Sequence, residues 1–174
     1  SYLQKARSEV AKLVNADLDQ VVFTSGGTEA NSMIMQLSNS PLVSAIEHDA
    51  VMASSSNLNL INVNSDGIVD LEMLEATIKK TNVDMISVMW ANNETGVIQP
   101  MTEIIKIAKK YKIYIHCDAV QALGKIDLDF KSSGLNSMAI SSHKIGGPVG
   151  VGALILKDPF DVNPIILGGG QEKG

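Results

Sequence analysis

The sequence predicts an α/β protein in which helices cover both faces of a mostly parallel sheet. Three observations indicate this architecture. Short runs rich in β-branched residues alternate with amphipathic helical runs almost throughout the chain. The run 83–90 is largely apolar, as is typical of strands that are buried on both faces. Polar and glycine-rich segments follow several predicted strands, at the positions where such sheets bind their ligands.

The composition indicates a globular protein with an acidic balance. Of the 174 residues, 45% are hydrophobic and 19% are charged, which suffices for one domain with a sizeable core. The net charge of -5 includes no basic block, so nucleic acid is not expected as a main partner. No apolar run approaches the roughly 18 residues of a membrane span, and residues 1–7 are amphipathic rather than signal-like. The single cysteine, Cys117, excludes an internal disulfide and fits a reducing compartment.

The two ends of the chain differ from those expected of a complete domain. A helical pattern begins at the first residues without a cap, and residues 168–174 form a loop that leads to no further element. We therefore expect the chain to be a piece of a longer polypeptide.

The first predicted elements are a helix and a short strand. Apolar residues of 2–14 recur every three or four positions and form one face of a helix. Residues 20–24 are β-branched and predict a buried strand. The turn 24–31 contains two adjacent glycines and opens the next helix, so that converging amides and a helix N-terminus suit a phosphate. The alternative is a plain tight turn capped by Ser25 or Thr28.

Two further strand–helix units follow. The strand 41–46 leads to His48, where a new helix begins. A histidine at the carboxyl end of a strand is placed to stack on a flat ring, whereas a solvated histidine at a helix start is the alternative. The strand 58–63 continues through a polar turn into the helix 71–80, which Asp70 caps.

The loop 91–100 after the strand 83–90 contains two asparagines and a glutamate. Such groups are costly to bury unless they bind something, so Asn93 is a candidate binding residue. An Asx-rich turn is the alternative. The next helix presents Ile104, Ile105 and other apolar residues on one face.

Three chemically distinct residues end the strand 112–118. By the two-residue period, His116 and Asp118 lie on one face and Cys117 on the other. Neighbouring strand residues cannot converge on one ion, and no second ligand cluster exists, so we predict no metal site. We interpret Cys117 as a small buried hydrophobe rather than a nucleophile. Asp118 ends an apolar strand, where a carboxylate needs a cationic partner or a protonated ring nitrogen.

Lys144 lies in the polar turn 141–148. A short helix 119–124 and a strand 136–140 precede this turn, and a glycine-spaced strand 149–156 follows it. Considered alone, Lys144 is best interpreted as a surface lysine in a loop.

The position of the other candidates changes that interpretation. The glycine turn, His48, Asn93, Asp118 and Lys144 all fall at predicted strand ends, which meet at one edge of a parallel sheet. Turn chemistry alone does not explain so many polar residues on one edge. Together they predict a Schiff-base lysine that holds an aldehyde cofactor.

Six stretches of the chain carry a resemblance to a known family. They are residues 23–31, 47–48, 91–96, 118–121, 141–144 and 168–172. In order and spacing they resemble the class V aminotransferase group of pyridoxal-phosphate enzymes, and most closely the cysteine desulfurases of the iron–sulfur-cluster and nitrogen-fixation type. The sequence Asn-Asn-Glu-Thr-Gly at 92–96 separates this branch from the sulfur-mobilisation and selenocysteine-lyase branch.

The resemblance implies a role for each candidate site residue. Lys144 would form the Schiff base with pyridoxal phosphate and move protons at the α-carbon of the substrate. His48 would stack on the ring face and handle protons. Asp118 would keep the pyridine nitrogen protonated, Gln121 would hydrogen-bond the phenolic oxygen, and Asn93 would lie beside the ring. The implied phosphate-binding residues are Gly27, Thr28, Ser141 and His143.

The sequence also departs from the family pattern. Ser142 stands where the family usually has glycine, and Gln171 stands where it often has histidine. The family's N-terminal stretch, its small domain, the arginine that binds the substrate carboxylate and the loop cysteine that accepts sulfur are all absent. We therefore expect residues 1–174 to be a pyridoxal-phosphate-binding large domain, incomplete at both ends, that lacks turnover alone. Cys117 cannot replace the missing cysteine, because it faces away from Asp118.

The resemblance further implies the activity of the parent enzyme. It would convert L-cysteine to L-alanine and transfer the sulfur as a persulfide, for iron–sulfur clusters or tRNA thiolation. It would be a homodimer that meets a cluster scaffold protein or another sulfur acceptor, in the cytoplasm or, in a eukaryote, the mitochondrial matrix. Two alternatives stay open: another class V aminotransferase or lyase, and a truncated pyridoxal-phosphate-binding product without turnover.

Overall fold

The computed structural model describes residues 1–159, 162–163, 165, 168–170 and 172. In this part of the chain the strands are β1 (Val21–Thr24), β2 (Pro41–Ser44), β3 (Asn59–Ile61), β4 (Met85–Ser87), β5 (Tyr114–Asp118), β6 (Ser137–Ser141) and β7 (Gly152–Leu156). The helices are α1 (Tyr2–Leu13), α2 (Gly27–Met35), α3 (Asp49–Met52), α4 (Leu71–Lys80), α5 (Met101–Lys110) and α6 (Phe130–Ser133). Two 3₁₀ segments are η1 (Leu18–Gln20) and η2 (Ser142–Ile145). No helix among these is long and apolar enough to cross a membrane.

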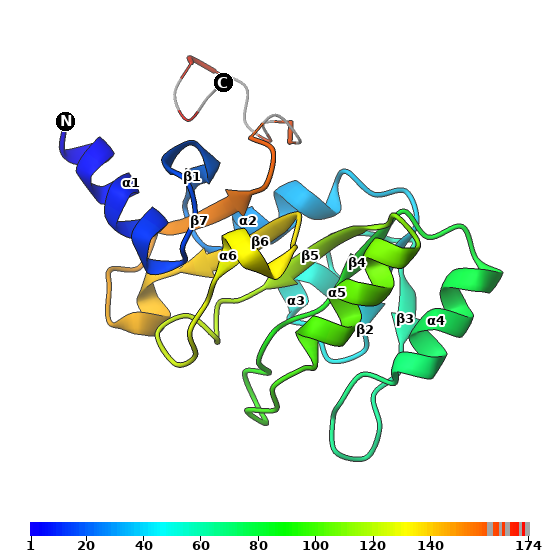
Figure 1. Ribbon diagram of the computed structural model, residues 1–174. Helices are drawn as coiled ribbons and strands as arrows, with labels where there is room; N and C mark the ends of the chain where they lie inside the picture. The colour runs from blue at the N-terminus through cyan, green and yellow to red at the C-terminus, as the bar shows by residue number, and fades with distance from the viewer. Residues whose placement is uncertain (160–161, 164, 166–167, 171, 173–174) are drawn as a thin grey trace.

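All of these strands belong to one sheet, in the order β1-β7-β6-β5-β4-β2-β3 (Figure 1). Within the run β3-β2-β4-β5-β6, each pair of adjacent strands is parallel. The strand β7 runs antiparallel to both β1 and β6. The prediction of a mostly parallel sheet is therefore confirmed.

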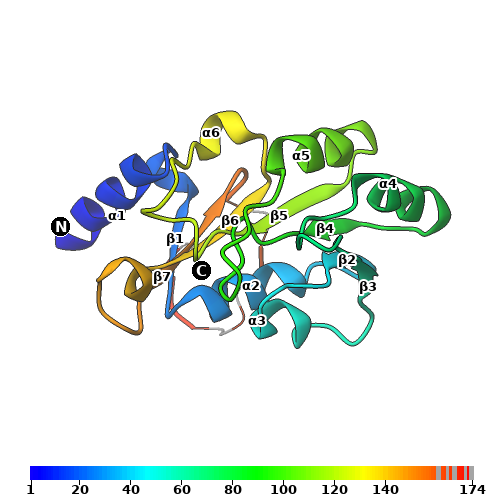
Figure 2. The same cartoon turned by 90° about the horizontal axis from the view of Figure 1, so that it is seen from below.

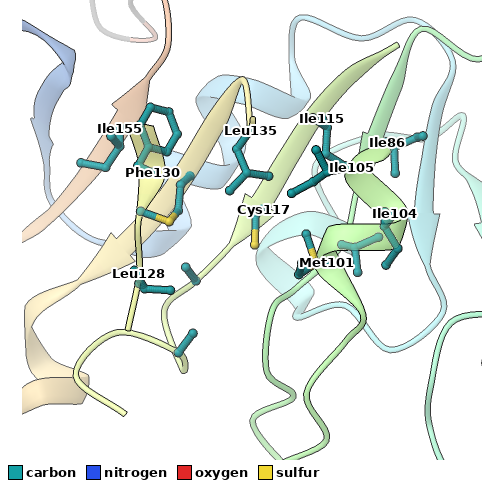
Figure 3. Close-up of a cluster of buried hydrophobic side chains, with 14 of the residues drawn as sticks. Ile86, Met101, Ile104, Ile105, Ile115, Cys117, Leu128, Phe130, Leu135 and Ile155 are labelled. Carbon is teal, nitrogen blue, oxygen red and sulfur yellow. The ribbon is translucent and has the colours of Figure 1, made fainter. Parts of the chain in front are cut away.

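Helices cover both faces of this sheet, as predicted. Figure 2 shows α1, α4, α5 and α6 on one side and α2 and α3 on the other. On the first side, Ile104 and Ile105 of α5 pack in a cluster with Ile115 and Cys117 of β5 (Figure 3). On the second side, a separate cluster joins α2 to the sheet, and Ile34 of α2 is fully buried in it.

Two helix starts show how the sequence determines these elements locally. The Asp70 side chain accepts a hydrogen bond from the backbone N–H of Met73 at 2.9 Å, so α4 begins where the capping residue predicts. The helix α1 was expected to begin without a cap. Instead, the hydroxyl of Ser1 accepts a hydrogen bond from the N–H of Gln4 at 3.4 Å.

The predicted helix 119–124 is wrong, since a series of turns occupies these positions. The Asp118 side chain accepts from the N–H of Val120, and Gly124 has a positive φ of 72°, so the chain bends rather than continuing as a helix. The short helix α6 was not predicted. Its four residues begin after Asp129, which accepts from the N–H of Ser132 at 3.1 Å. A single helical turn of this kind has no apolar period to reveal it.

The carboxyl ends of the parallel strands meet at one edge of the sheet, and β7 begins at the same edge. Its first residue, Gly152, pairs with Thr24 of β1 and Ser141 of β6. A Cβ atom on Gly152 would lie 2.6 Å from the backbone of Gly26, so only glycine permits this approach. The glycine turn after β1 is thereby held against the end of β6.

Candidate active site

A cavity of about 240 Å³ lies at this edge of the sheet. Every candidate site residue contributes to its lining, although these residues come from segments far apart in the sequence. They are Gly27, Thr28, His48, Asn93, Asp118, Gln121, Ser141, His143 and Lys144. The lining also includes residues that the sequence analysis did not single out, namely Asn31, Ala50, Met89 and Val120.

One end of the cavity is formed by the start of α2 and the end of β6. No side chain caps α2, so capping by Ser25 or Thr28 does not occur. A Cβ atom on Gly27 would lie 2.6 Å from Cγ2 of Val120, which explains why glycine is needed there. The helix N-terminus, with its amides and partial positive charge, is suited to an anion.

The hydroxyl of Ser141 adds a polar group to this end. Ser141 is 1% exposed, and its Oγ lies 2.8 Å from Nδ1 of His143. His143 and Lys144 follow it in η2 and are both exposed. Lys144 is therefore an exposed lysine, as expected, but it lies in a 3₁₀ turn rather than a loop, and it also lines the cavity. The interpretation of Lys144 as a surface lysine and its place in the cavity lining are therefore compatible.

Asp118 is a buried carboxylate at the base of the cavity, 5% exposed. Its Oδ1 accepts a hydrogen bond from the N–H of Val120 at 2.9 Å, and its Oδ2 accepts one from Nδ2 of Asn31 at 2.7 Å. Burial raises the pKa of Asp118, while these two donors and the nearby His48 act to lower it. The burial of Asp118 at a strand end predicted a partner for it, and Asn31 is a partner that the sequence did not reveal.

His48 and the preceding Glu47 occupy the turn after β2. The Nδ1 atom of His48 accepts from the N–H of Ala50 at 3.0 Å and caps α3, so His48 is a helix-start histidine that also lines the cavity. Glu47 is 8% exposed, and its Oε1 accepts from Oγ of Ser44 at 2.7 Å and from the N–H of Met89 at 2.6 Å. This carboxyl group joins the end of β2 to the segment after β4. Burial raises the pKa of Glu47 to about 8.

The two asparagines of the 91–100 loop have different environments. Asn92 is buried, and its Oδ1 accepts from the N–H groups of Glu94 and Thr95 at 3.0 and 2.9 Å. The Asx-turn alternative is therefore correct for Asn92. Asn93 is exposed and lines the cavity. The turn that Asn92 stabilises thus places Asn93 in the cavity lining.

Gln121 is the remaining candidate residue in the cavity lining. Oε1 of Gln121 accepts a hydrogen bond from Nζ of Lys125 at 2.7 Å, which leaves its NH₂ group as the donor. Among the described residues, no group of histidine, cysteine and carboxylate side chains has a metal-binding arrangement. Gln171 lies outside the described residues.

Comparison with known proteins gives a consistent result. The family model described as aminotransferase class-V matches residues 1–173. The mitochondrial cysteine desulfurase of Saccharomyces cerevisiae is 39% identical over an alignment of 189 positions, which covers 99% of this chain and 38% of that protein. The cysteine desulfurase IscS of Dictyoglomus turgidum is 39% identical over an alignment of 185 positions, which covers 98% of this chain and 47% of that protein.

Solved structures agree with these relatives. The NifS-like protein from Rickettsia africae superimposes with a TM-score of 0.90 at 39% identity, over 99% of this chain and 52% of that one. The chain therefore spans about half, or less, of the length of the proteins it matches.

Proposed function

This chain belongs to the class-V aminotransferase family, and we propose that it forms the cofactor-binding part of a pyridoxal-phosphate-dependent cysteine desulfurase. The observation that carries the proposal is the single cavity lined by Lys144, Asp118, His48 and the start of α2. The activity is proposed for the protein that contains this chain, since the chain spans only part of its relatives.

The side chains around the cavity fit pyridoxal phosphate in three respects. The uncapped start of α2, together with Ser141 and His143, suits a phosphate group. Both oxygens of Asp118 accept hydrogen bonds from the protein, which favours a carboxylate suited to a protonated ring nitrogen. Lys144, in turn, lines the cavity with an amine that suits an aldehyde.

We assign the following roles to these residues. When bound, the cofactor supplies an electron sink for charge that develops at the α-carbon of the amino-acid substrate. Asp118 holds the proton on the ring nitrogen, and Lys144 anchors the aldehyde carbon and moves a proton at the α-carbon. His48 stacks on the ring and handles a proton there, and Asn93 lies beside the ring. The NH₂ group of Gln121 donates to the phenolic oxygen, while Gly27, Thr28, Ser141 and His143 hold the phosphate.

The sulfur acceptor lies outside residues 1–174 in this proposal. Cys117 is the single cysteine, it is fully buried, and it faces the apolar cluster under α5. Burial raises its pKa well above the ordinary range, so it stays a thiol rather than a nucleophilic thiolate. A cysteine thiolate from another segment would take the sulfur of L-cysteine as a persulfide and release L-alanine.

We extend the proposal to the organisation of the whole protein. Residues 1–174 form most of its large domain, and the complete enzyme is a homodimer that delivers sulfur to a cluster scaffold or another acceptor. The mitochondrial and bacterial relatives support a location in the cytoplasm or the mitochondrial matrix.

The experiment that tests the cofactor assignment compares Lys144→Ala with wild type. Purified wild-type protein mixed with pyridoxal phosphate should gain a visible absorption band, and borohydride reduction should fix the cofactor on the peptide that contains Lys144. Lys144→Ala should lose both signals. Lys131→Ala is the matched control, because Lys131 is an exposed lysine that pairs with Asp17 on the surface. Identical spectra for wild type and Lys144→Ala would contradict the assignment.

A further inference from the structure

A continuous row of buried polar side chains leads from Asp118 into the protein. Nδ2 of Asn31 lies 2.7 Å from Oδ2 of Asp118, and Oδ1 of Asn31 lies 2.8 Å from Nε2 of His116. Nδ1 of His116 lies 2.8 Å from Oγ of Ser137. The row runs from Asp118 on β5 to α2, back to His116 on β5, and then to β6.

All four side chains of this row are withdrawn from solvent. His116 and Ser137 are 0% exposed, Asn31 is 1% exposed and Asp118 is 5% exposed. Water therefore does not compete for these hydrogen bonds, and each polar atom depends on its protein partner. Only Asp118 and Asn31 line the cavity, so His116 lies behind them.

The chemistry of the row determines where its hydrogens lie. A carboxylate only accepts, so Asn31 must turn its NH₂ group to Asp118 and its oxygen to His116. Nε2 of His116 must then carry a hydrogen and donate it to that oxygen. If His116 is neutral, Nδ1 has no hydrogen and accepts from the hydroxyl of Ser137.

The surroundings of His116 favour this neutral form. Burial lowers the pKa of His116 to about 3. The strands β4 and β6 present Ser87 and Ser137 beside it, and α2 presents Asn31. The titratable groups on the same face of β5 are Tyr114 and Asp118, and Asp118 is separated from His116 by the Asn31 amide. From the end of β2, His48 acts to lower the pKa of Asp118, and Asp118 acts to raise the pKa of Glu47.

We propose that His116 and Asn31 are positioning residues that hold Asp118 as an acceptor-only carboxylate aimed at the cofactor ring nitrogen. His116 fixes the orientation of the Asn31 amide by donating from Nε2, and the amide in turn fixes Oδ2 of Asp118. If the amide were released, it could present its oxygen to Asp118, and the carboxyl group would then need a proton. The inference rests on the proposed function, because the ring nitrogen belongs to the proposed cofactor.

The first test needs no cofactor. The protein without pyridoxal phosphate is labelled with ¹⁵N-histidine, and the His116 signals are identified by their loss in His116→Gln. We expect a neutral ring with hydrogen on Nε2 that does not titrate between about pH 6 and pH 8, where an ordinary histidine does. Asn31→Leu should mix the two tautomers, because it removes the oxygen to which Nε2 donates, whereas Ser137→Ala should keep the hydrogen on Nε2. A cationic His116, or hydrogen on Nδ1 in wild type, would overturn the inference.

The second test measures the dissociation constant of pyridoxal phosphate in matched variants. His116→Gln keeps a side-chain N–H near the position of Nε2, whereas His116→Phe keeps the ring shape without any donor. We expect His116→Phe to bind pyridoxal phosphate about tenfold more weakly than wild type, because it loses one hydrogen bond of the row that ends at the charged Asp118. His116→Gln should bind pyridoxal phosphate nearly as tightly as wild type does. Equal affinity in His116→Phe and wild type would overturn the inference, as would equal weakening in both variants.

The two tests separate failure of the inference from failure of the proposed function. Wild-type protein that binds no pyridoxal phosphate would overturn the proposed function, and the ¹⁵N signals would still decide whether the row has the stated hydrogens. Should His116→Phe fail to fold, as judged by circular dichroism, Asn31→Leu provides the second variant, because it removes the acceptor of the Nε2 hydrogen. There, an unchanged Nε2–H tautomer together with unchanged affinity would contradict the role of the row.

Discussion

The two faces of β5 differ sharply, although their residues alternate along one strand. One face presents His116 and Asp118, which are buried but hydrogen-bonded to Asn31 of α2. The other presents Cys117, which packs among apolar side chains below α5 (Figure 3). Polar groups are buried on the side where the opposing helix supplies partners, and chemistry is proposed only there. The apolar face stabilises the strand that holds Asp118 in place.

The largest expected effect comes from weakening the apolar face. Ile104 of α5 is 0% exposed in the cluster that contains Cys117. Ile104→Ala should lower the free energy of unfolding by about 2–5 kcal/mol, because a cavity remains where the side chain was. Urea unfolding measures this loss. If the faces have separate roles, pyridoxal-phosphate affinity of the remaining folded protein should stay close to wild type, and a large change in affinity would show that the faces are coupled.

The next effect tests the polar face directly. Asp118→Asn keeps the shape of the side chain but removes the charge proposed to face the ring nitrogen. Pyridoxal phosphate should bind about 30-fold more weakly or worse, as expected when about 2 kcal/mol is lost from a buried charge pair. Absorbance titration measures the affinity. Unfolding of the protein without cofactor is the control, and there the variant should be at least as stable, because burial of Asp118 raises its pKa.

The third prediction concerns Glu47, which is a second buried carboxyl group near the edge of the sheet where Asp118 lies. Its pKa is raised from an ordinary 4.5 to about 8, so the folded protein binds more protons than the unfolded chain between these values. Stability should therefore fall as pH rises from about 4.5 to about 8. Glu47→Gln cannot ionise, and it should exceed wild type in unfolding free energy by several kcal/mol at pH 8, at about 1.4 kcal/mol for each unit of raised pKa, and by far less at pH 5.

Thermal or urea unfolding at the two pH values checks this difference. In contrast to Asp118, whose two oxygens both have donors, Oε2 of Glu47 has no hydrogen-bond partner among the described residues. A charged oxygen without a hydrogen-bond donor is costly to bury, which agrees with the raised pKa of Glu47. A constant difference between Glu47→Gln and wild type across pH would contradict it.

The smallest expected effect concerns Cys117. Cys117→Ala should leave pyridoxal-phosphate affinity unchanged and lower the unfolding free energy by about 1 kcal/mol, as for a small buried side chain. Native protein should react with a maleimide reagent only on unfolding, because its thiol is buried and its pKa is raised. Rapid labelling of the native protein would show that the apolar face opens.

Much of the fold was predictable from the sequence, because the relevant patterns are local. The period of two in β5 correctly separated His116 and Asp118 from Cys117, and Asp70 correctly predicted the start of α4. The features missed have no such pattern. The helix α6 is a single turn, and the segment 119–124 bends because the Asp118 side chain takes the N–H of Val120.

The candidate site was predictable to the same degree. Parallel strands bring their carboxyl ends to one edge, so a residue at a strand end was assigned to that edge without knowing its neighbours. Asn31 was missed because it lies inside a helix, 87 positions from Asp118 in sequence. Glu47 was noted only as part of the resemblance, since its bonds to Ser44 and Met89 depend on how β2 and β4 pair.

The sequence by itself determined the strands, the longer helices, the strand-end residues and the resemblance to the family. Spacing along the chain is enough for these, because side-chain direction follows the period of each element. The tertiary structure alone decided that Asn31, His116 and Ser137 form a row behind Asp118. Buried polar groups must find partners in space rather than in sequence, and only the packing of α2 on β5 and β6 supplies those partners.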